Sequence, residues 1–317
     1  MTSNGYESSP FREAPVRSRR TAASRPRSAR PAHGRERPAS PLSLWIVPPL
    51  VSLAIQLWDL TVPAYSRDET ATLSAAERPF GALVRMLHNV DVVHGTYYSL
   101  IWVIVLVAGP GELATRLPSA VATAVTAAVV FGLARRLVSP RTGLAAGLVF
   151  AVILQVSYWG QTARPYALEI TLAATASYLL VRAMQAAASG DKSYRWWIAA
   201  YGASLVSLGY VQFLGLLVIA AHLVPVARTW LRHRADGKGT GLALGWIAAV
   251  LAAIVIVSPV MVTGLEQRGI GKNPLDLGFI RNLVGLIGTI YMGRAGRRGR
   301  GVRGSYQCLP GPGQAAG

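Results

Sequence analysis

The chain alternates between long apolar runs and short polar segments over most of its length. Most of these runs have the length of about 17–25 residues that an α-helix needs to cross a bilayer. Tryptophan and tyrosine occur mainly near the ends of the runs, as in the aromatic belts of membrane proteins. The pattern predicts an all-α fold, a polytopic transmembrane helix bundle. The apolar segments are 44–62, 97–108, 117–134, 142–158, 165–188, 196–210, 211–227, 241–263 and a last one that begins near 277.

Two of the apolar stretches have unusual lengths. Segment 97–108 spans only about 18 Å as an α-helix, whereas the hydrocarbon core is about 30 Å thick. We therefore expect an in-plane or re-entrant helix within a large external loop, residues 63–116. The stretch 196–227 is instead too long for one helix. It predicts a tight hairpin that turns around Gly209–Tyr210.

Basic residues between the apolar runs predict the orientation, because Lys and Arg concentrate in cytoplasmic loops. If segment 97–108 does not cross, the N-terminus and all three basic clusters lie in the cytoplasm, and we prefer this topology. If it crosses, the first and third clusters lie outside. The sequence thus predicts a multi-pass protein of the plasma (inner) membrane. The clusters are Arg135, Arg136 and Arg141; Lys192 and Arg195; and Arg228, Arg232, Arg234 and Lys238.

Composition argues against a soluble domain. The chain is 52% hydrophobic and 15% charged, whereas an average soluble domain carries about 25% charged residues. The net charge of +18 fits membrane topology and anionic lipid headgroups better than nucleic acid. The single Cys308 excludes an internal disulfide framework and a cysteine-based metal cluster.

The two ends differ in composition from the apolar region, residues 42–292. Residues 1–41 are rich in Ser, Pro, Ala and Arg, which predicts a disordered basic cytoplasmic tail, since such a segment buries little apolar surface. Residues 293–317 are rich in Gly and Arg without any apolar period. This composition indicates either a basic tail that binds RNA or lipid, or a frameshifted or truncated product. We favour the second interpretation, which leaves open whether this short form is an active enzyme.

Most carboxylates outside the tail fall on the predicted external side, so we expect the chemistry there. Asp68 and Glu69 follow the first apolar run, next to Arg67. A carboxylate at this place can act as general base toward a hydroxyl acceptor, and a neighbouring arginine helps to keep it ionised. The alternative is an ordinary helix start with acidic residues in its first turn.

Three further segments on the same side could bind a ligand. His94, Tyr97 and Tyr98 could hold a sugar or phosphate, or they could form an aromatic belt. Arg116 precedes Pro118, which predicts a helix that starts there. Arg164 precedes Tyr166 at another helix start. Either arginine could hold a lipid phosphate or extend its charge to the headgroups.

Four motifs in order resemble one family: Arg-Asp-Glu-Thr at 67–70, His-Gly-Thr-Tyr-Tyr at 94–98, Thr-Arg-Leu-Pro-Ser-Ala at 115–120, and Ala-Arg-Pro-Tyr-Ala-Leu at 163–168. They are similar to the protein O-mannosyltransferase-like branch (glycosyltransferase family 39-like) of the polyprenyl-phosphate-dependent membrane glycosyltransferases, the GT-C superfamily. The resemblance covers about residues 44–190. It implies a GT-C-like bundle that moves a sugar, commonly mannose, from a polyprenyl-phosphate donor with inversion.

The resemblance also implies roles for individual residues. Asp68 would be the catalytic base, and Glu69 would assist it or contact the acceptor. Arg116 and Arg164 would neutralise the departing lipid phosphate. The segment of His94, Tyr97 and Tyr98 would line the donor site, with Gly95 where many relatives have proline. Arg67 and Tyr166 complete the expected donor-binding set.

Partners and cofactors follow from the same interpretation. We expect the donor, anionic lipids and an acceptor that is a protein, glycan or lipid, and no nucleic acid. No histidine–carboxylate cluster has metal-ligand spacing, so no metal is required, and a divalent ion stays an open alternative. The competing functions are a transporter or lipid-linked sugar flippase, and a non-catalytic membrane partner. The absence of an internal repeat disfavours a transporter.

Overall fold

The computed structural model describes residues 41–233 and 238–267. Within these ranges all regular structure is helical, which confirms the predicted fold class. The expected basic tail, the last apolar run and the Gly/Arg-rich segment lie outside the described residues. The helices in chain order are α1 (Pro41–Leu57), α2 (Arg67–Ala76), α3 (Phe80–Asn89), η1 (Val92–His94), α4 (Gly95–Ala108), α5 (Glu112–Leu137), α6 (Pro140–Ala151), α7 (Leu154–Gly160), α8 (Tyr166–Ser189), α9 (Tyr194–Val211), η2 (Phe213–Leu217), α10 (Val218–His233) and α11 (Lys238–Gln267).

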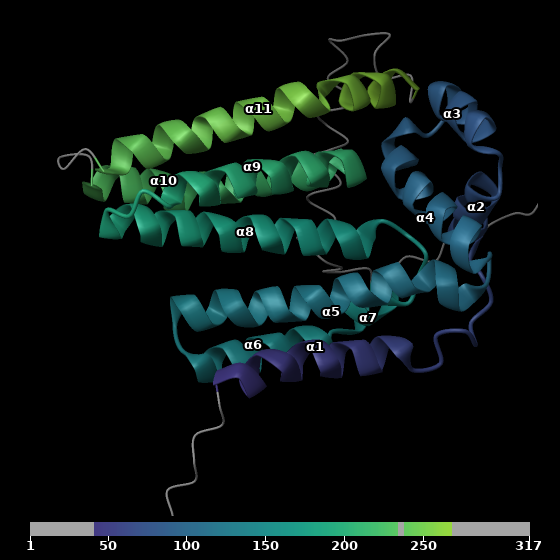
Figure 1. Cartoon of the computed structure of the whole chain (residues 1–317), viewed down its shortest axis with the longest axis horizontal. Helices are drawn as coiled ribbons and strands as arrows, with labels where there is room; N and C mark the ends of the chain where they lie inside the picture. The colour runs from purple at the N-terminus through teal and green to yellow at the C-terminus, as the bar shows by residue number, and fades with distance from the viewer. Residues whose placement is uncertain (1–40, 234–237, 268–317) are drawn as a thin grey trace, which may run out of the picture. The chain divides into compact units, whose positions relative to one another are not determined.

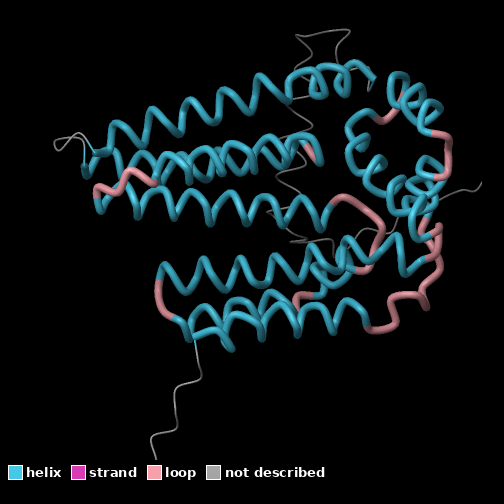
Figure 2. The backbone as a smooth tube through the Cα atoms, in the orientation of Figure 1, coloured by secondary structure: helices cyan, strands magenta, loops and turns pink. Residues whose placement is uncertain are grey.

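The long helices run back and forth between two ends of a bundle (Figure 1). The short helices α2, α3 and α4 gather at one end, which we call the α2–α4 end. The loops at both ends are short apart from the segments that join these small helices (Figure 2). Helices α1, α5 and α6 lie side by side, as do α8, α9 and α11.

Among the described residues, four helical segments are long and apolar enough to cross a membrane: Glu112–Leu137, Tyr166–Ser189, Phe213–His233 and Gly239–Gln267. A fifth is available if the bent pair α6–α7 counts as one span. Exposed Leu, Ile and Val side chains along these helices fit contact with lipid tails. The chain is a multi-pass membrane protein.

Several boundaries differ from the sequence-based expectation. The first apolar helix ends at Leu57 instead of continuing to 62. Helix α5 begins at Glu112, so Pro118 lies inside it and not at its start. The run 142–158 breaks after Ala151 with a bend of 65°. The hairpin turn falls at Gln212, whose extended backbone (φ −161°) ends α9, slightly after the predicted Gly209–Tyr210.

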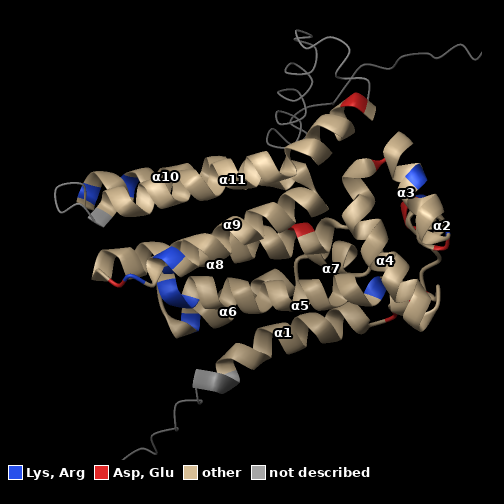
Figure 3. Cartoon of the chain, turned by 45° about the horizontal axis from the view of Figure 1, so that its top comes forward, with Lys and Arg blue, Asp and Glu red and all other residues tan. Residues whose placement is uncertain are grey.

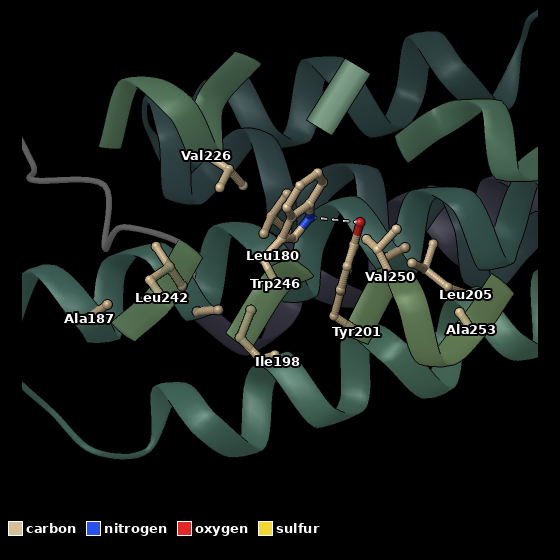
Figure 4. Close-up of a cluster of buried hydrophobic side chains, with 12 residues drawn as sticks. Leu180, Ala187, Ile198, Tyr201, Leu205, Val226, Leu242, Trp246, Val250 and Ala253 are labelled. Atoms are coloured by element: carbon tan, nitrogen blue, oxygen red, sulfur yellow. Dashed lines mark hydrogen bonds between the residues drawn. The ribbon is translucent and has the colours of Figure 1, made fainter. Parts of the chain in front are cut away.

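A chain of hydrogen bonds runs through the apolar core between α8, α9, α10 and α11, and Figure 4 shows this core with the first bond, from Trp246 to Tyr201. Trp246 Nε1 donates to Tyr201 Oη at 3.1 Å, and this oxygen lies 3.1 Å from His222 Nδ1. His222 Nε2 lies 3.0 Å from Ser177 Oγ, which donates to Ala173 O. Because Ser177 Oγ uses its proton on Ala173 O, it accepts from His222 Nε2, and Nδ1 of a neutral His222 accepts from Tyr201 Oη. One polar chain thus joins four helices.

Charge is distributed unevenly along the bundle (Figure 3). Arg135 and Arg136 occupy the last turn of α5, and Arg232 that of α10. These positions lie at the end opposite α2–α4, where α1 begins. The described members of the three basic clusters therefore share one end, which is the arrangement that the preferred topology requires.

Candidate active site

Helix α2 starts with a capping box that gives two adjacent carboxylates opposite environments. Ser66 Oγ accepts from Glu69 N at 3.3 Å, while Glu69 Oε2 accepts from Ser66 N at 2.9 Å. This reciprocal pair sets the first residue of the helix. Glu69 consequently turns inward and is 2% exposed. Asp68 and Arg67 stay exposed in the same first turn, where an acidic group complements the helix dipole.

Glu69 forms a buried bidentate ion pair with Arg116 of α5. Arg116 Nε donates to Oε1 at 2.8 Å and Nη2 to Oε2 at 3.2 Å. Burial raises the pKa of Glu69, but the hydrogen bonds from Arg116 and from the backbone amides of Ala163 and Ser66 outweigh it and hold the pKa below its usual value. Both carboxylate oxygens are therefore ionised acceptors occupied by donors of the protein.

Arg116 uses its remaining donors on backbone carbonyls. Nη1 donates to Leu60 O and Pro63 O, both at 2.8 Å, and Nη2 donates to Ala64 O at 3.4 Å. The guanidinium also lies 5.0 Å from the centre of the Tyr65 ring. With the two bonds to the carboxylate, these contacts account for all five N–H groups. Arg116, 1% exposed, joins the α1–α2 connection to α5.

The connection between α7 and α8 meets the same carboxylate. Ala163 N donates to Glu69 Oε1 at 2.9 Å, which sets the position of the next residue, Arg164. This guanidinium is buried, and its Nε has no hydrogen-bond partner among the described residues. Its Cζ lies 5.7 Å from the centre of the Tyr166 ring.

Arg164 keeps its charge despite burial. Burial lowers the pKa of the guanidinium, but contact with Tyr166 and the negative charge of Asp68 outweigh it and raise the pKa. Tyr98 also contributes to this shift. Arg164 is thus a buried cation with an unused donor, and it lies within electrostatic reach of the exposed carboxylate at the start of α2.

A second polar group lies where η1 joins α4. Asp91 Oδ1 lies 2.7 Å from His94 Nδ1, and Oδ2 accepts from Tyr98 Oη at 2.6 Å. The hydrogen bond from His94 is the main cause that lowers the pKa of Asp91 to about 2, and the charge of Arg164 adds to it. Because an ionised carboxylate only accepts, a neutral His94 carries its proton on Nδ1 and keeps Nε2 as an acceptor.

The sequence analysis selected His94, Tyr97 and Tyr98 from this segment but not Asp91. Its backbone is left-handed (φ 64°), a conformation that asparagine and aspartate adopt more readily than most residues. An aspartate three residues before a histidine was the available signal. Tyr97 of the same segment is 0% exposed, and its Oη lacks a partner among the described residues.

The structure brings most of the expected site residues together. Arg164 is electrostatically coupled to Asp68, Tyr97, Tyr98, Tyr166 and, through Asp91, to the His94 group. Arg67 forms no hydrogen bond or ion pair with another described residue. No group of three or more His, Cys, Asp or Glu side chains in the described ranges is arranged to hold a metal ion.

An apolar groove of ≈ 470 Å³ adjoins this group. Residues of α4, α5 and α8 line it, among them Ile104, Leu117, Val121, Leu168 and Thr171. Leu168 also packs against the buried cluster of Tyr97, Tyr98 and Ile101. The groove therefore adjoins the cluster that contains Tyr97 and Tyr98, and both of these tyrosines lie within electrostatic reach of Arg164.

A family model described as dolichyl-phosphate-mannose-protein mannosyltransferase matches residues 96–262, more than half of the chain. The chain belongs to this family. It is a membrane glycosyltransferase of the GT-C type, and the family implies a lipid-linked sugar donor and an acceptor. The matched range contains Tyr97, Tyr98, Arg116, Arg164 and Tyr166, and starts after Asp68, Glu69 and His94. A search of the curated proteins with this chain found no match.

Proposed function

We propose that the chain transfers a sugar, mannose in the first instance, from a polyprenyl-phosphate donor to an acceptor hydroxyl. The observation that carries this proposal is Arg164, a buried cation with an unused Nε–H group beside the exposed Asp68. A buried charge is costly unless it is paired. A phosphate in this place supplies the missing partner and satisfies the donor.

The apolar groove next to the tyrosines suits the lipid part of such a donor. Its lining is almost entirely aliphatic, and two of the three helices that line it, α5 and α8, have membrane-spanning length. A polyprenyl chain in the groove brings its phosphate to Arg164 at the α2–α4 end. The sugar then lies in the region of Asp68, His94 and Tyr98, with Arg67, Tyr97 and Tyr166 at its borders.

In the proposed reaction Asp68 accepts the proton of the acceptor hydroxyl as the oxygen attacks the anomeric carbon. The bond from this carbon to the phosphate oxygen breaks, and its electron pair stays on the phosphate. Arg164 stabilises the charge that develops there. Attack from the face opposite the phosphate inverts the anomeric centre. Glu69 and Arg116 hold α2 against α5 and so present Asp68.

The proposed location is the plasma (inner) membrane, with the N-terminus in the cytoplasm and the α2–α4 end outside. The basic residues at the opposite end support this orientation, since they suit the cytoplasmic face and its anionic lipids. The acceptor is a protein, glycan or lipid hydroxyl that is reached from the external side.

The test is transfer of radiolabelled mannose from mannosyl-phosphoryl-polyprenol by the full chain in proteoliposomes. Asp68→Asn, which keeps the shape of the side chain, should reduce transfer at least about 100-fold, as expected for loss of a general base. Glu77→Gln is the matched control, because it makes the same exchange of carboxylate for amide at an exposed residue at the other end of α2. It should leave transfer within about twofold of the wild type.

Two results would contradict this function. Full transfer by the Asp68→Asn protein would remove Asp68 as the base. Movement of the intact donor across sealed vesicles, without transfer to any hydroxyl acceptor, would identify a flippase instead.

A further inference from the structure

The last turn of α11 contacts the turn that carries Asp91. Gln267 Oε1 accepts from Val92 N at 2.9 Å, and Gln267 Nε2 donates to Leu87 O at 2.8 Å. A single side chain from the far end of the described chain therefore bridges α3 and η1. Both bonds span a large separation in sequence, so they fix tertiary and not local structure.

Both backbone groups that Gln267 meets are helix-end groups. Leu87 lies in the last turn of α3, where a carbonyl has no N–H partner within the helix. Val92 is the first residue of η1, where the N–H has no carbonyl partner within the helix. A backbone group that is shielded from water and has no partner destabilises the fold. Gln267 thus caps two helices that meet at Asp91, one at its C-terminus and one at its N-terminus.

The contact is also close in its apolar part. A Cβ on Gly264 would lie 2.6 Å from Val93 Cγ1, and the next atom is 3.7 Å away, so glycine is needed here as long as residue 93 is valine. Beside it, a pocket of ≈ 280 Å³ remains between α3, η1 and α11, lined in part by Leu87, Val92 and Thr263. Because the interface is not filled, the two hydrogen bonds of Gln267 carry much of its geometry.

We propose that Gln267 is a positioning residue of the site, which caps α3 and η1 together and thereby holds Asp91 and His94 in place. Val92 N belongs to the peptide bond that follows Asp91. The left-handed backbone of Asp91 costs conformational free energy, so it persists only where contacts with the surrounding structure stabilise it. Asp91 in turn orients His94 and Tyr98. The catalytic consequence of this inference rests on the proposed function, whereas its structural part does not.

The structural part is tested by a pair of cysteines, Val93→Cys with Gly264→Cys, in a Cys308→Ser chain. The two Cβ positions are at most about 4 Å apart, a separation that a disulfide can bridge. We expect rapid disulfide formation under mild oxidation. Adding Gln267→Ala should slow this step about tenfold, since η1 then leaves α11 more often. Ser258→Ala, which removes a hydroxyl bonded only within α11, should not slow it. Equal rates with and without Gln267 would overturn the proposal, and this measurement needs no activity.

The catalytic part is tested by rescue. In the reduced pair, Gln267→Ala should lower sugar transfer about tenfold, the effect of about 1.4 kcal/mol. In the oxidised pair, the disulfide holds η1 against α11 in place of the two hydrogen bonds of Gln267. The same change should then lower transfer less than about twofold. An equal loss in both forms would show that Gln267 does not act by holding η1. If no form transfers sugar while the disulfide rates differ as expected, the proposed function is wrong, but the structural role of Gln267 is supported.

Discussion

Arg116 and Arg164 were equivalent candidates in the sequence, since each lies just before a proline near a predicted helix start. The structure gives them different surroundings. Arg116 places all five N–H groups on the Glu69 carboxylate and on three backbone carbonyls. Arg164 is also buried but keeps an Nε–H without a partner among the described residues. Arg116 is fully bonded within the protein, and in the proposed function the donor phosphate binds the free Nε–H of Arg164.

The comparison separates two uses of a buried charge. A fully bonded ion pair fixes the fold, because removing one partner leaves the other uncompensated. A partly bonded buried cation destabilises the folded protein in the absence of an anion, and binding of an anion removes this destabilisation. Replacing Arg116 should therefore lower mainly the free energy of unfolding, whereas replacing Arg164 should lower mainly the rate of sugar transfer.

The largest effect is expected from Arg116→Met. It leaves the Glu69 carboxylate buried without its cation and removes the donors to three carbonyls, so the free energy of unfolding should fall by about 3–5 kcal/mol. Thermal unfolding in detergent measures this change. Arg136→Met, at an exposed arginine bonded to Tyr178 and Gln185, is the control and should cost under about 1 kcal/mol. Similar unfolding of the two variants would end the distinction between the arginines.

The second effect should appear in transfer. Arg164→Met removes a buried cation without breaking a complete ion pair, so we expect little change in the unfolding temperature. Loss of charge stabilisation at the leaving phosphate should reduce kcat by about 100–1000-fold. Mannose transfer and thermal unfolding are measured on the same preparation. A variant that unfolds as readily as Arg116→Met, or one that transfers normally, would contradict the role of Arg164.

The fold could be predicted from the sequence because a series of apolar runs of membrane-spanning length is typical of a transmembrane helix bundle. Boundaries were less predictable. Gly111 sets the start of α5 as its N-cap, and its signal was weaker than that of Pro118, which the helix tolerates inside. The bend between α6 and α7 falls between Ala151 and Leu154, where the sequence has no Gly or Pro, so composition gave no sign of it.

The site was predictable as a set of residues but not as a set of contacts. The adjacent Asp68 and Glu69 are equivalent in the sequence until the capping box turns one inward. Gln267 was invisible because its two partners lie far away in the chain. Short-range motifs report which residues can do chemistry, whereas tertiary packing decides which of them keep a free donor or acceptor.

Asp91→Asn should have a smaller, pH-dependent effect. The folded protein lowers the pKa of Asp91 to about 2 from its ordinary 3.8, so the ionised form stabilises the fold above about pH 4, and this contribution is lost as the pH falls toward 2. With the side chain 35% exposed, solvent screening reduces it to about 1 kcal/mol. The difference in unfolding temperature between wild type and Asp91→Asn should shrink over this range. Parallel curves would contradict the assignment.

The smallest effects compare the tyrosines beside the two arginines. Tyr65 Oη donates to Pro110 O at 3.0 Å and lies 2.8 Å from Thr115 Oγ1, so Tyr65→Phe keeps the ring on Arg116 but should lower the free energy of unfolding by about 1 kcal/mol. Transfer per folded molecule should not change. Tyr166→Phe should instead raise the KM for the donor about threefold, because Arg164 loses a hydroxyl that helps to orient it, and it should unfold like the wild type. The comparison fails if both phenylalanine variants change the same quantity, since the two arginines would then share one role.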